Sequence, residues 1–307
     1  MVDVDRFTVR PCTPDDIPAI LALARADEER VSGRPSRLSE DDFREWWQSV
    51  DLTRSSWLLL QRGDDVPVAA TWLERQGTEL VVTFPVAPTA DALPVMLDLA
   101  EEGARDLGKR RLHVALPEPD PEPRRVLSGR SYREIRRFLH MAVALSAPPP
   151  ALALPAGLTL QPVTAQDTAA FHAALSEAFA DHWEFHPETF DVWWDRVSTT
   201  PGFDLGWWFT VREGDEVAAV VRNLPGRDDG VYVAALGVRR PWRGRGLARA
   251  LLLHTFARAY EAGVERVSLN VDATNPTGAT ALYRSVGMSV EFENSVWEMD
   301  IAPAARG

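Results

Sequence analysis

The sequence repeats one pattern of apolar and polar positions. Apolar and polar side chains alternate at 7–11 as they do in a half-buried strand, and a helix-start signal and an alanine- and leucine-rich segment at 17–26 follow. The same order returns in the second half of the chain, with a strand-like run at 158–162 and an alanine-rich segment at 168–179. Each half is therefore predicted to open with a strand and a helix.

Further matches extend the repeat beyond these opening elements. A tryptophan pair on a predicted helix, Trp46 and Trp47, has its counterpart in Trp193 and Trp194, and a strand with a Gly-Asp hairpin turn follows each pair. We expect these rings to pack in cores, because large aromatic side chains on a helix are usually buried. Because the matching segments occur in the same order in both halves of the chain, the sequence predicts a tandem repeat of one whole domain. The predicted boundaries are residues 1–146 for the first copy, 147–157 for a proline-rich linker and 158–307 for the second copy.

The second copy contains a turn rich in arginine and glycine. An apolar, β-branched run at 231–236 predicts a buried strand before this turn, and apolar periodicity at 247–260 predicts a helix after it. Glycines in the turn let the backbone approach a ligand, and the first N–H groups of the helix point at the same place. The two arginines in 243–246 add positive charge. The stretch therefore predicts a binding site for a diphosphate.

The corresponding stretch of the first copy, residues 86–94, lacks this chemistry. It contains neither glycine nor arginine, and Asp91 stands near the position where phosphate would bind. Pro94 also removes a backbone donor. When the two copies are aligned on their repeated features, Leu127 of the first copy stands opposite Tyr283 of the second. We therefore expect the first copy to keep the fold, as a scaffold or as a wall of the acceptor site.

Two common phosphate motifs do not fit the turn. A Walker loop needs Lys and then Ser or Thr after its last glycine, whereas Leu247 and Ala248 follow here. A dinucleotide-binding fingerprint needs a small residue at the position of Arg249. The site is therefore predicted to be a phosphate cradle of another class.

The turn resembles the pyrophosphate motif of the GNAT acyltransferase superfamily. The matching residues are Arg243, Gly246 and Ala248, in the pattern R/Q-x-x-G-x-G/A. A second motif supports the match, because 275–288 is similar to the superfamily's N-x-x-A-x-x-L-Y-x-x-x-G-F, with one extra residue before Tyr283 and Met in place of Phe. Both motifs occur in the expected order, with a predicted strand between them.

This resemblance implies an α/β (α+β) fold class with two tandem GNAT domains. Each domain would be a mixed, mostly antiparallel sheet that is flanked by helices and splayed between its fourth and fifth strands. Acetyl-CoA, the donor substrate, would bind in the split of the second copy. At the positions that match the family's motifs, the residues expected to bind it are Leu236, Gly237, Val238, Arg243, Gly244, Arg245, Gly246, Leu247, Ala248 and Asn275.

The resemblance also implies the reaction, which is acetyl transfer from the thioester directly to the amine of a small molecule. Such an enzyme holds the amine against the carbonyl carbon, removes a proton from the nitrogen and supplies one to the departing thiolate. Tyr283 would lie near the sulfur, and its phenol, with an ordinary pKa of about 10, is the candidate general acid. Asp272 and Glu177 are candidates for the general base.

The sequence leaves the identity of the base open, because a base must lie within hydrogen-bond reach of its proton. His182 and His186 have the spacing of metal ligands on a helix, but Pro187 follows them and no third ligand is evident, so we expect no metal. Further candidates for the base are Tyr232, Asp228, Asp229, Asp181, His182, Glu184 and His186. For any one of the candidates a position on the solvated surface is more common than a catalytic role.

Composition narrows the possible partners of this 307-residue chain. A net charge of −12 argues against nucleic acid, and no apolar run has the length of a membrane span. The acidic start does not resemble a secretory signal, and Cys12, the single cysteine, suggests a reducing cytoplasm. The oligomeric state is not predicted. The alternative to an N-acetyltransferase is a CoA-binding sensor or interaction protein without turnover.

Overall fold

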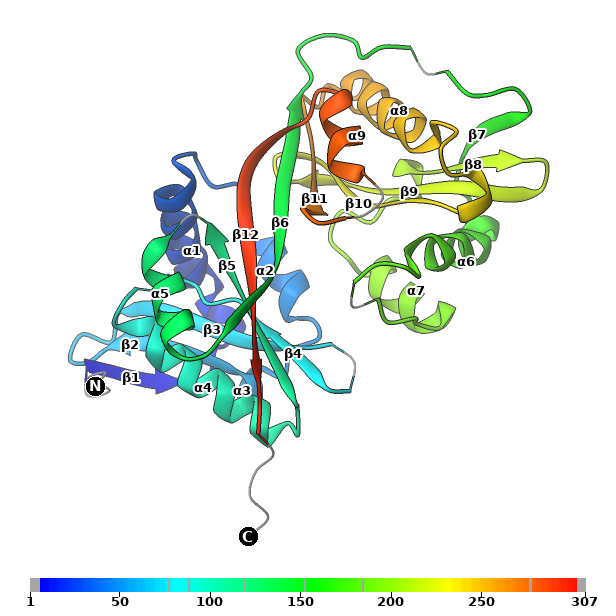
Figure 1. Ribbon diagram of the computed structural model, residues 1–307. Helices are drawn as coiled ribbons and strands as arrows, with labels where there is room; N and C mark the ends of the chain where they lie inside the picture. The colour runs from blue at the N-terminus through cyan, green and yellow to red at the C-terminus, as the bar shows by residue number, and fades with distance from the viewer. Residues whose placement is uncertain are drawn as a thin grey trace. The chain divides into compact units, whose positions relative to one another are not determined.

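The chain folds into two compact units in the computed structural model of the protein (Figure 1). Unit 1 comprises Met1–Phe138 and Phe292–Gly307, and unit 2 comprises Leu139–Glu291. The chain passes from unit 1 to unit 2 within strand β6 (Arg133–Ala144) and returns within strand β12 (Ser289–Asp300). The structure describes residues 6–76, 78–87, 89–118, 120–151, 153–183, 185–275 and 278–302.

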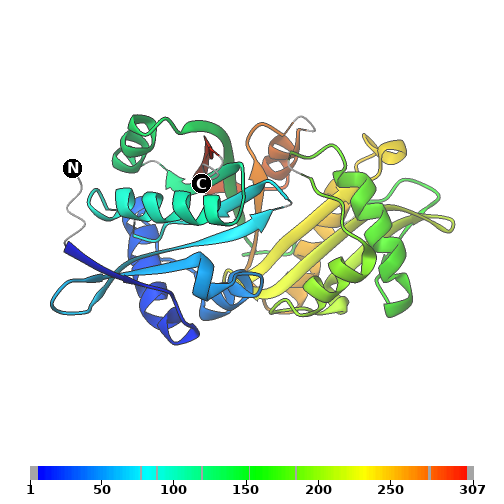
Figure 2. The same ribbon diagram turned by 90° about the horizontal axis from the view of Figure 1, so that it is seen from below.

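Unit 1 is a mixed, mostly antiparallel sheet with helices on both faces. Its further elements are β1 (Phe7–Arg10), a 3-10 turn η2 (Pro14–Asp16), α1 (Ile17–Ser32), α2 (Glu40–Trp47), α3 (Leu52–Ser55), β2 (Ser56–Gln61), β3 (Pro67–Gln76), β4 (Leu80–Thr83), α4 (Ala92–Asp106), β5 (Arg111–Glu118) and α5 (Pro121–Gly129). The strand order is β1-β2-β3-β4-β5-β12, in which β4 and β5 are parallel. Successive side chains point to opposite faces, so Leu73 shares a core cluster with residues of α4, and Trp72 shares one with residues of α1. Helices α4 and α1 lie on opposite faces of this sheet (Figure 2).

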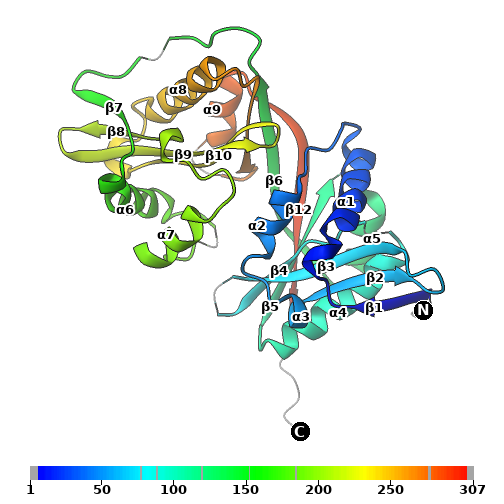
Figure 3. The ribbon, with the colours of Figure 1, turned by 180° about the vertical axis from the view of Figure 1, so that it is seen from behind.

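Unit 2 has the same architecture. Its further elements are β7 (Leu158–Pro162), η3 (Ala165–Asp167), α6 (Thr168–Phe179), α7 (Phe190–Ser198), η4 (Leu205–Trp207), β8 (Trp208–Glu213), β9 (Glu216–Arg227), β10 (Gly230–Val238), η5 (Arg240–Trp242), α8 (Leu247–Glu261), β11 (Arg266–Asp272) and α9 (Ala279–Ser285). The strand order is β6-β11-β10-β9-β8-β7, in which β10 and β11 are parallel and β7 to β10 pair antiparallel. Helices α6 and α8 cover opposite faces of this sheet (Figure 3). Both units therefore confirm the predicted fold class.

The two units exchange strands between the sequence copies. Strand β12 is the last strand of the second copy, yet its residues Glu293 to Asp300 pair antiparallel with β5 of unit 1. Strand β6 ends the first copy, yet its residues from Leu139 onward belong to unit 2, next to β11. The predicted boundaries at 1–146, 147–157 and 158–307 separate the two sequence copies and their linker, and they stay a prediction. The compact units divide the chain at other positions.

The repeated tryptophans pack in the cores, as expected. Trp47 and Trp193 are buried, with 6% and 5% of their surfaces exposed. Trp46 is half-buried and stacks on Trp72, with ring centroids 6.2 Å apart. Trp194 stacks in the same way on a phenylalanine of its own helix, α7. The tryptophan pairs therefore join a helix to the sheet in each unit.

Gly237 determines how closely α6 approaches β10. A Cβ atom at this position would lie 2.8 Å from the Cβ of Ala178 and 3.3 Å from the Phe179 ring, which is closer than packed carbon atoms come. The helix reaches this distance only because the strand residue has no side chain. The end of α6 is thereby held beside the last residues of β10.

We expect Gly237→Ala to destabilise the protein by about 1–3 kcal/mol, because the added methyl group overpacks the α6–β10 contact. Denaturant unfolding measures this loss. Gly129→Ala in α5 is the control, since its Cβ would meet no atom within 4 Å. Equal unfolding midpoints for wild type and Gly237→Ala would contradict the packing argument.

Candidate active site

Strands β10 and β11 separate shortly after they begin. They pair in parallel at Val231 with Val267 and at Tyr232 with Ser268, and the pairing ends there. On its other side β10 has a bulge against β9 at Ala234, where the register shifts. A bulge bends its strand and redirects backbone groups. The separation is the split between the fourth and fifth strands that the resemblance implies.

The arginine- and glycine-rich turn forms the predicted link between β10 and α8. Gly244 and Gly246 have φ angles of +75° and +80°, in the left-handed region that favours glycine, and Gly246 is the N-cap of α8. A Cβ atom on either residue would meet nothing within 4 Å, so open space lies before them. The first N–H groups of α8 have no partner within the helix and carry the positive end of its dipole. The turn therefore has the geometry of an anion cradle.

One pocket of about 270 Å³ joins this turn to the ends of β10, α6 and α9. All predicted cofactor-binding residues line it except Arg245 and Asn275. Tyr283 lines it as well, although more than forty positions separate it from β10 in the sequence. The lining residues are Ala178, His182, Leu236, Gly237, Val238, Trp242, Arg243, Gly244, Gly246, Leu247, Ala248, Arg249, Ala279, Leu282 and Tyr283.

The arginines of the turn have partners within unit 2. The Arg243 guanidinium donates to the backbone carbonyls of Ala178, at 3.1 Å, and Val238, at 3.2 Å. It therefore ties the end of α6 to the end of β10 as well as lining the pocket. Arg245 pairs with the carboxylate of Glu213 at 3.0 Å, which directs it away from the pocket lining.

Tyr283 lies on α9 with its side chain buried, at 8% exposure. Burial, together with the smaller effect of the neighbouring Tyr232 phenol, raises the pKa of Tyr283 to about 12. The hydroxyl therefore stays protonated throughout the physiological pH range. Asn275, which precedes α9, donates its backbone N–H to the carbonyl of Asp272 at 3.0 Å and so closes the turn after β11.

The predicted base candidates have other partners. Glu177 accepts a hydrogen bond from Arg239 at 2.6 Å. One carboxylate oxygen of Asp272 accepts from both the backbone N–H and the hydroxyl of Thr274, each at 2.8 Å. Asp181 pairs with Arg240, which lowers the pKa of its carboxyl. Glu184 lies outside the described residues. None of the described carboxylates among these lines the pocket.

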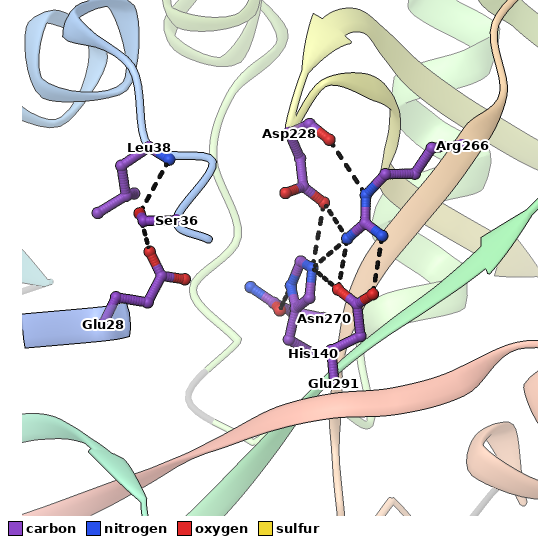
Figure 4. Close-up of polar contacts among 8 residues, drawn as sticks. All are labelled: Glu28, Ser36, Leu38, His140, Asp228, Arg266, Asn270 and Glu291. Carbon is purple, nitrogen blue, oxygen red and sulfur yellow. Dashed lines mark hydrogen bonds and ion pairs between the residues drawn. The ribbon is translucent and has the colours of Figure 1, made fainter. Parts of the chain in front are cut away.

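Asp228 belongs to a buried charge cluster at the base of the split (Figure 4). It accepts from Arg266 at 3.1 Å and lies 3.1 Å from Nε2 of His140, a residue of β6. Arg266 also pairs with Glu291 of β12, and Nδ1 of His140 lies 2.8 Å from the side-chain oxygen of Asn270. Burial alone would raise the pKa of Asp228, but His140 and Arg266 hold it at about 2. Asp228 is therefore a structural anion and too weak a base to accept a proton.

His182 lines the same pocket as Tyr283. It follows α6 in a turn closed by its N–H to the carbonyl of Phe179, and its ring packs on the Phe179 ring at 4.2 Å. Within the described part of the chain, neither ring nitrogen has a hydrogen-bond partner. Burial lowers the pKa of the imidazole and Arg243 lowers it further, while Asp272 and Asp181 raise it. The pocket therefore contains a neutral imidazole at neutral pH. The sequence named His182 only as one candidate among many, because nothing local distinguished it.

Other features of the described residues concern metals and membranes. Among them no group of three or more His, Cys, Asp and Glu side chains is arranged to hold a metal ion. None of the described helices combines the length and the apolar character needed to cross a membrane.

Comparisons with known proteins agree with this geometry. A sequence model of the acetyltransferase (GNAT) family matches residues 169–288. A mycothiol acetyltransferase of Thermobispora bispora is 31% identical over 292 residues, which cover 90% of this chain and 94% of that protein. The crystal structure of a GCN5-related N-acetyltransferase from Sphaerobacter thermophilus is similar with a TM-score of 0.84 and 27% identity, over 99% of this chain and 98% of that one. A tandem GNAT protein from the clavulanic acid biosynthesis pathway shares the fold, with a TM-score of 0.73 at 17% identity over 97% and 100% of the two chains.

The cradle predicts that Gly246→Asp greatly weakens the binding of CoA, the ligand that the resemblance implies, because a carboxylate would lie in the open space before the helix N-terminus. Gly246→Asn is the matched control, since Asn and Asp tolerate the left-handed region equally and differ in charge. Titration calorimetry with each variant, beside its thermal melt, measures the effect. Equal affinities of the two variants would show that no anion binds at this turn.

Proposed function

Because the chain belongs to the GNAT acetyltransferase family, we propose that it transfers the acetyl group of acetyl-CoA directly to the amine of a small molecule. The observation that supports this most is the single pocket that joins an anion cradle at a helix N-terminus to a protonated phenol and a neutral imidazole. The cradle suits the diphosphate of CoA. The other two groups suit proton transfer during acyl transfer.

The donor would be bound by the residues that line the pocket at its two ends. Backbone N–H groups of the turn from Gly244 to Ala248 would hold the diphosphate. Leu236, Gly237 and Val238 still pair with β9 but lie where β10 has lost its parallel partner. Apart from the Val238 carbonyl, which accepts from Arg243, the backbone groups on that edge would pair with the amide-rich pantetheine arm. Asn275 would act by closing the turn after β11, since it does not contact the pocket directly.

The reaction needs one new bond, one broken bond and two proton transfers. The amine nitrogen attacks the thioester carbonyl carbon, so that a C–N bond forms and the C–S bond breaks. In our proposal His182 accepts the proton that the nitrogen loses, and Tyr283 donates a proton to the departing thiolate. Proton exchange with water then restores both groups. Holding the amine against the carbonyl supplies a large part of the rate enhancement.

The two predicted bases have supporting roles in this proposal. Asp272 raises the pKa of His182, which means that its negative charge favours the imidazolium formed during the reaction. Glu177 is occupied by Arg239, whose guanidinium also donates to the carbonyl of Val217 at 2.9 Å. Glu177 therefore holds the start of the turn in place.

The acceptor can be identified by a screen for thiol release. Acetyl-CoA and the protein are mixed in turn with aminoglycosides, polyamines, amino sugars and amino acids. The amino sugars include the amine precursor of mycothiol, because a relative is named mycothiol acetyltransferase. We expect one class of amine to release free CoA and to gain an acetyl group, detected by mass spectrometry. The net charge of −12 favours cationic amines. Tight CoA binding without thiol release from any amine would instead support a CoA-binding protein without turnover.

We expect Tyr283→Phe to lower kcat by about 10²-fold, at the lower end of general-acid contributions, because a thiolate is already a good leaving group. The ring remains, so the KM for acetyl-CoA should change little, and kcat and kcat/KM should fall together. Steady-state rates with an accepted amine measure this. Wild-type turnover in the variant would make Tyr283 a packing residue.

The proposed base predicts an acidic limb in the pH profile. Since burial and Arg243 lower the pKa of His182, its base form should persist below the ordinary histidine range, and kcat should fall only as the pH drops through that lowered pKa. His182→Gln should remove this limb and lower kcat by about 10²-fold. His186→Gln, an exposed residue of the same loop, is the control. The assignment fails if His182→Gln keeps the wild-type limb.

A further inference from the structure

The base of the split contains a tyrosine that the proposed mechanism does not use. Tyr232 of β10 forms, with Ser268 of β11, the last parallel pair before the two strands separate. Burial raises the pKa of its phenol, and a hydrogen bond from the backbone N–H of Asn270 opposes part of this rise. The phenol therefore stays protonated at neutral pH and cannot be the general base, although the sequence makes it a candidate. Its role must follow from where the ring lies.

The side chain of Tyr232 reaches across the split from β10 to β11. A backbone N–H donates only over a short distance, so the phenol oxygen lies beside Asn270, two residues beyond the last strand pair. The same phenol contributes to the raised pKa of Tyr283, which means that the two phenols are neighbours. The ring of Tyr232 therefore closes the base of the split on the side next to the candidate general acid.

Contacts on several sides hold this ring in place. The guanidinium of Arg227 lies over its face, 5.1 Å from the ring centroid. Asn270, whose backbone bonds the phenol, has its side-chain oxygen 2.8 Å from Nδ1 of His140, in the charge cluster at the base of the split (Figure 4). The ring cannot turn aside without losing these contacts, so it is a fixed wall.

The pocket directs the end of a bound donor toward this wall. On β10 the pocket lining stops at Leu236, and Tyr283 lines the same pocket from α9. A donor with its diphosphate in the cradle and its sulfur beside Tyr283 would extend its acyl chain past Leu236, toward the base of the split. The next two residues of β10 in that direction, Ala235 and Ala234, have only methyl side chains. The ring of Tyr232 then ends the space.

We propose that the acyl group of the donor ends against the ring of Tyr232, and that this ring restricts the enzyme to short acyl chains such as acetyl. The inference rests on the proposed function and adds a specificity-determining residue to it. A longer chain would have to displace a ring that Arg227 and Asn270 hold, and overpacking of this kind is unfavourable.

The test compares four donors, acetyl-, propionyl-, butyryl- and hexanoyl-CoA, by their kcat/KM with an accepted amine. Calorimetry with the same donors and no amine gives a second measurement that does not need turnover. The proteins are wild type, Tyr232→Ala, Tyr232→Leu, Tyr232→Phe and Tyr260→Ala. Tyr260 is the matched control, because it is an exposed tyrosine of α8 that does not line the pocket. Thermal melts show which variants are folded.

We expect kcat/KM of wild type and Tyr260→Ala to fall by about 10- to 200-fold from acetyl-CoA to butyryl-CoA, the discrimination that a methylene group gives in an apolar pocket. Tyr232→Ala should remove most of this fall, because truncation opens the base of the split. Tyr232→Leu, a smaller truncation, should remove part of it. Tyr232→Phe keeps the ring and should keep the wild-type ratio between donors. The affinities should follow the same order.

Three results would overturn the inference. If wild type uses acetyl- and butyryl-CoA equally well, nothing in the split limits the acyl chain, and the proposed function stands. If folded Tyr232→Ala and Tyr232→Leu keep the wild-type ratio, the limit lies elsewhere. If Tyr232→Phe loses turnover with every donor, the hydroxyl takes part in the reaction and the ring is not merely a wall. Absence of turnover with every amine would contradict the proposed function alone, because the affinities still test the wall.

Discussion

The candidate site depends on the early separation of two parallel strands. Backbone N–H and C=O groups in a sheet are nearly always paired, so a strand that loses its neighbour must find other partners for them. Strand β10 loses β11 after Tyr232. The bulge at Ala234 bends the strand at this point, and the residues beyond it line the pocket. A ligand rich in amide groups can supply the missing partners.

The base of the split is held by charge and by close backbone contact. A Cβ atom on Gly230 would lie 2.4 Å from the carbonyl oxygen of Arg266, so the two strands begin in close approach. Arg266 then joins Asp228, in the turn between β9 and β10, to Glu291 on β12. Removing one partner from a buried guanidinium–carboxylate cluster strongly destabilises the fold, because it leaves a buried charge without compensation. The separation therefore starts from a fixed end, which fixes the direction in which the strands diverge.

The sequence predicted the features that depend on neighbouring residues. The turn at 243–246 and the segment before Met288 are local, because glycine positions and the adjacent strand and helix fix their shape. The contact of Arg243 with Ala178 and that of Glu177 with Arg239 could not be predicted, since each joins residues more than sixty positions apart. The place of His182 in the pocket could not be predicted either, because it depends on the contact between α6 and β10 at Gly237, which are also far apart in the sequence.

The exchange of β6 and β12 constrains how the two sequence copies can evolve. The first copy lacks the glycine turn and the tyrosine of the second copy. It cannot lose β6, because that strand supplies His140 to unit 2. Unit 1 depends equally on β12, a strand of the second sequence copy that pairs with β5. Each sequence copy thus supplies a strand to the unit built mainly by the other copy, whatever its part in ligand binding.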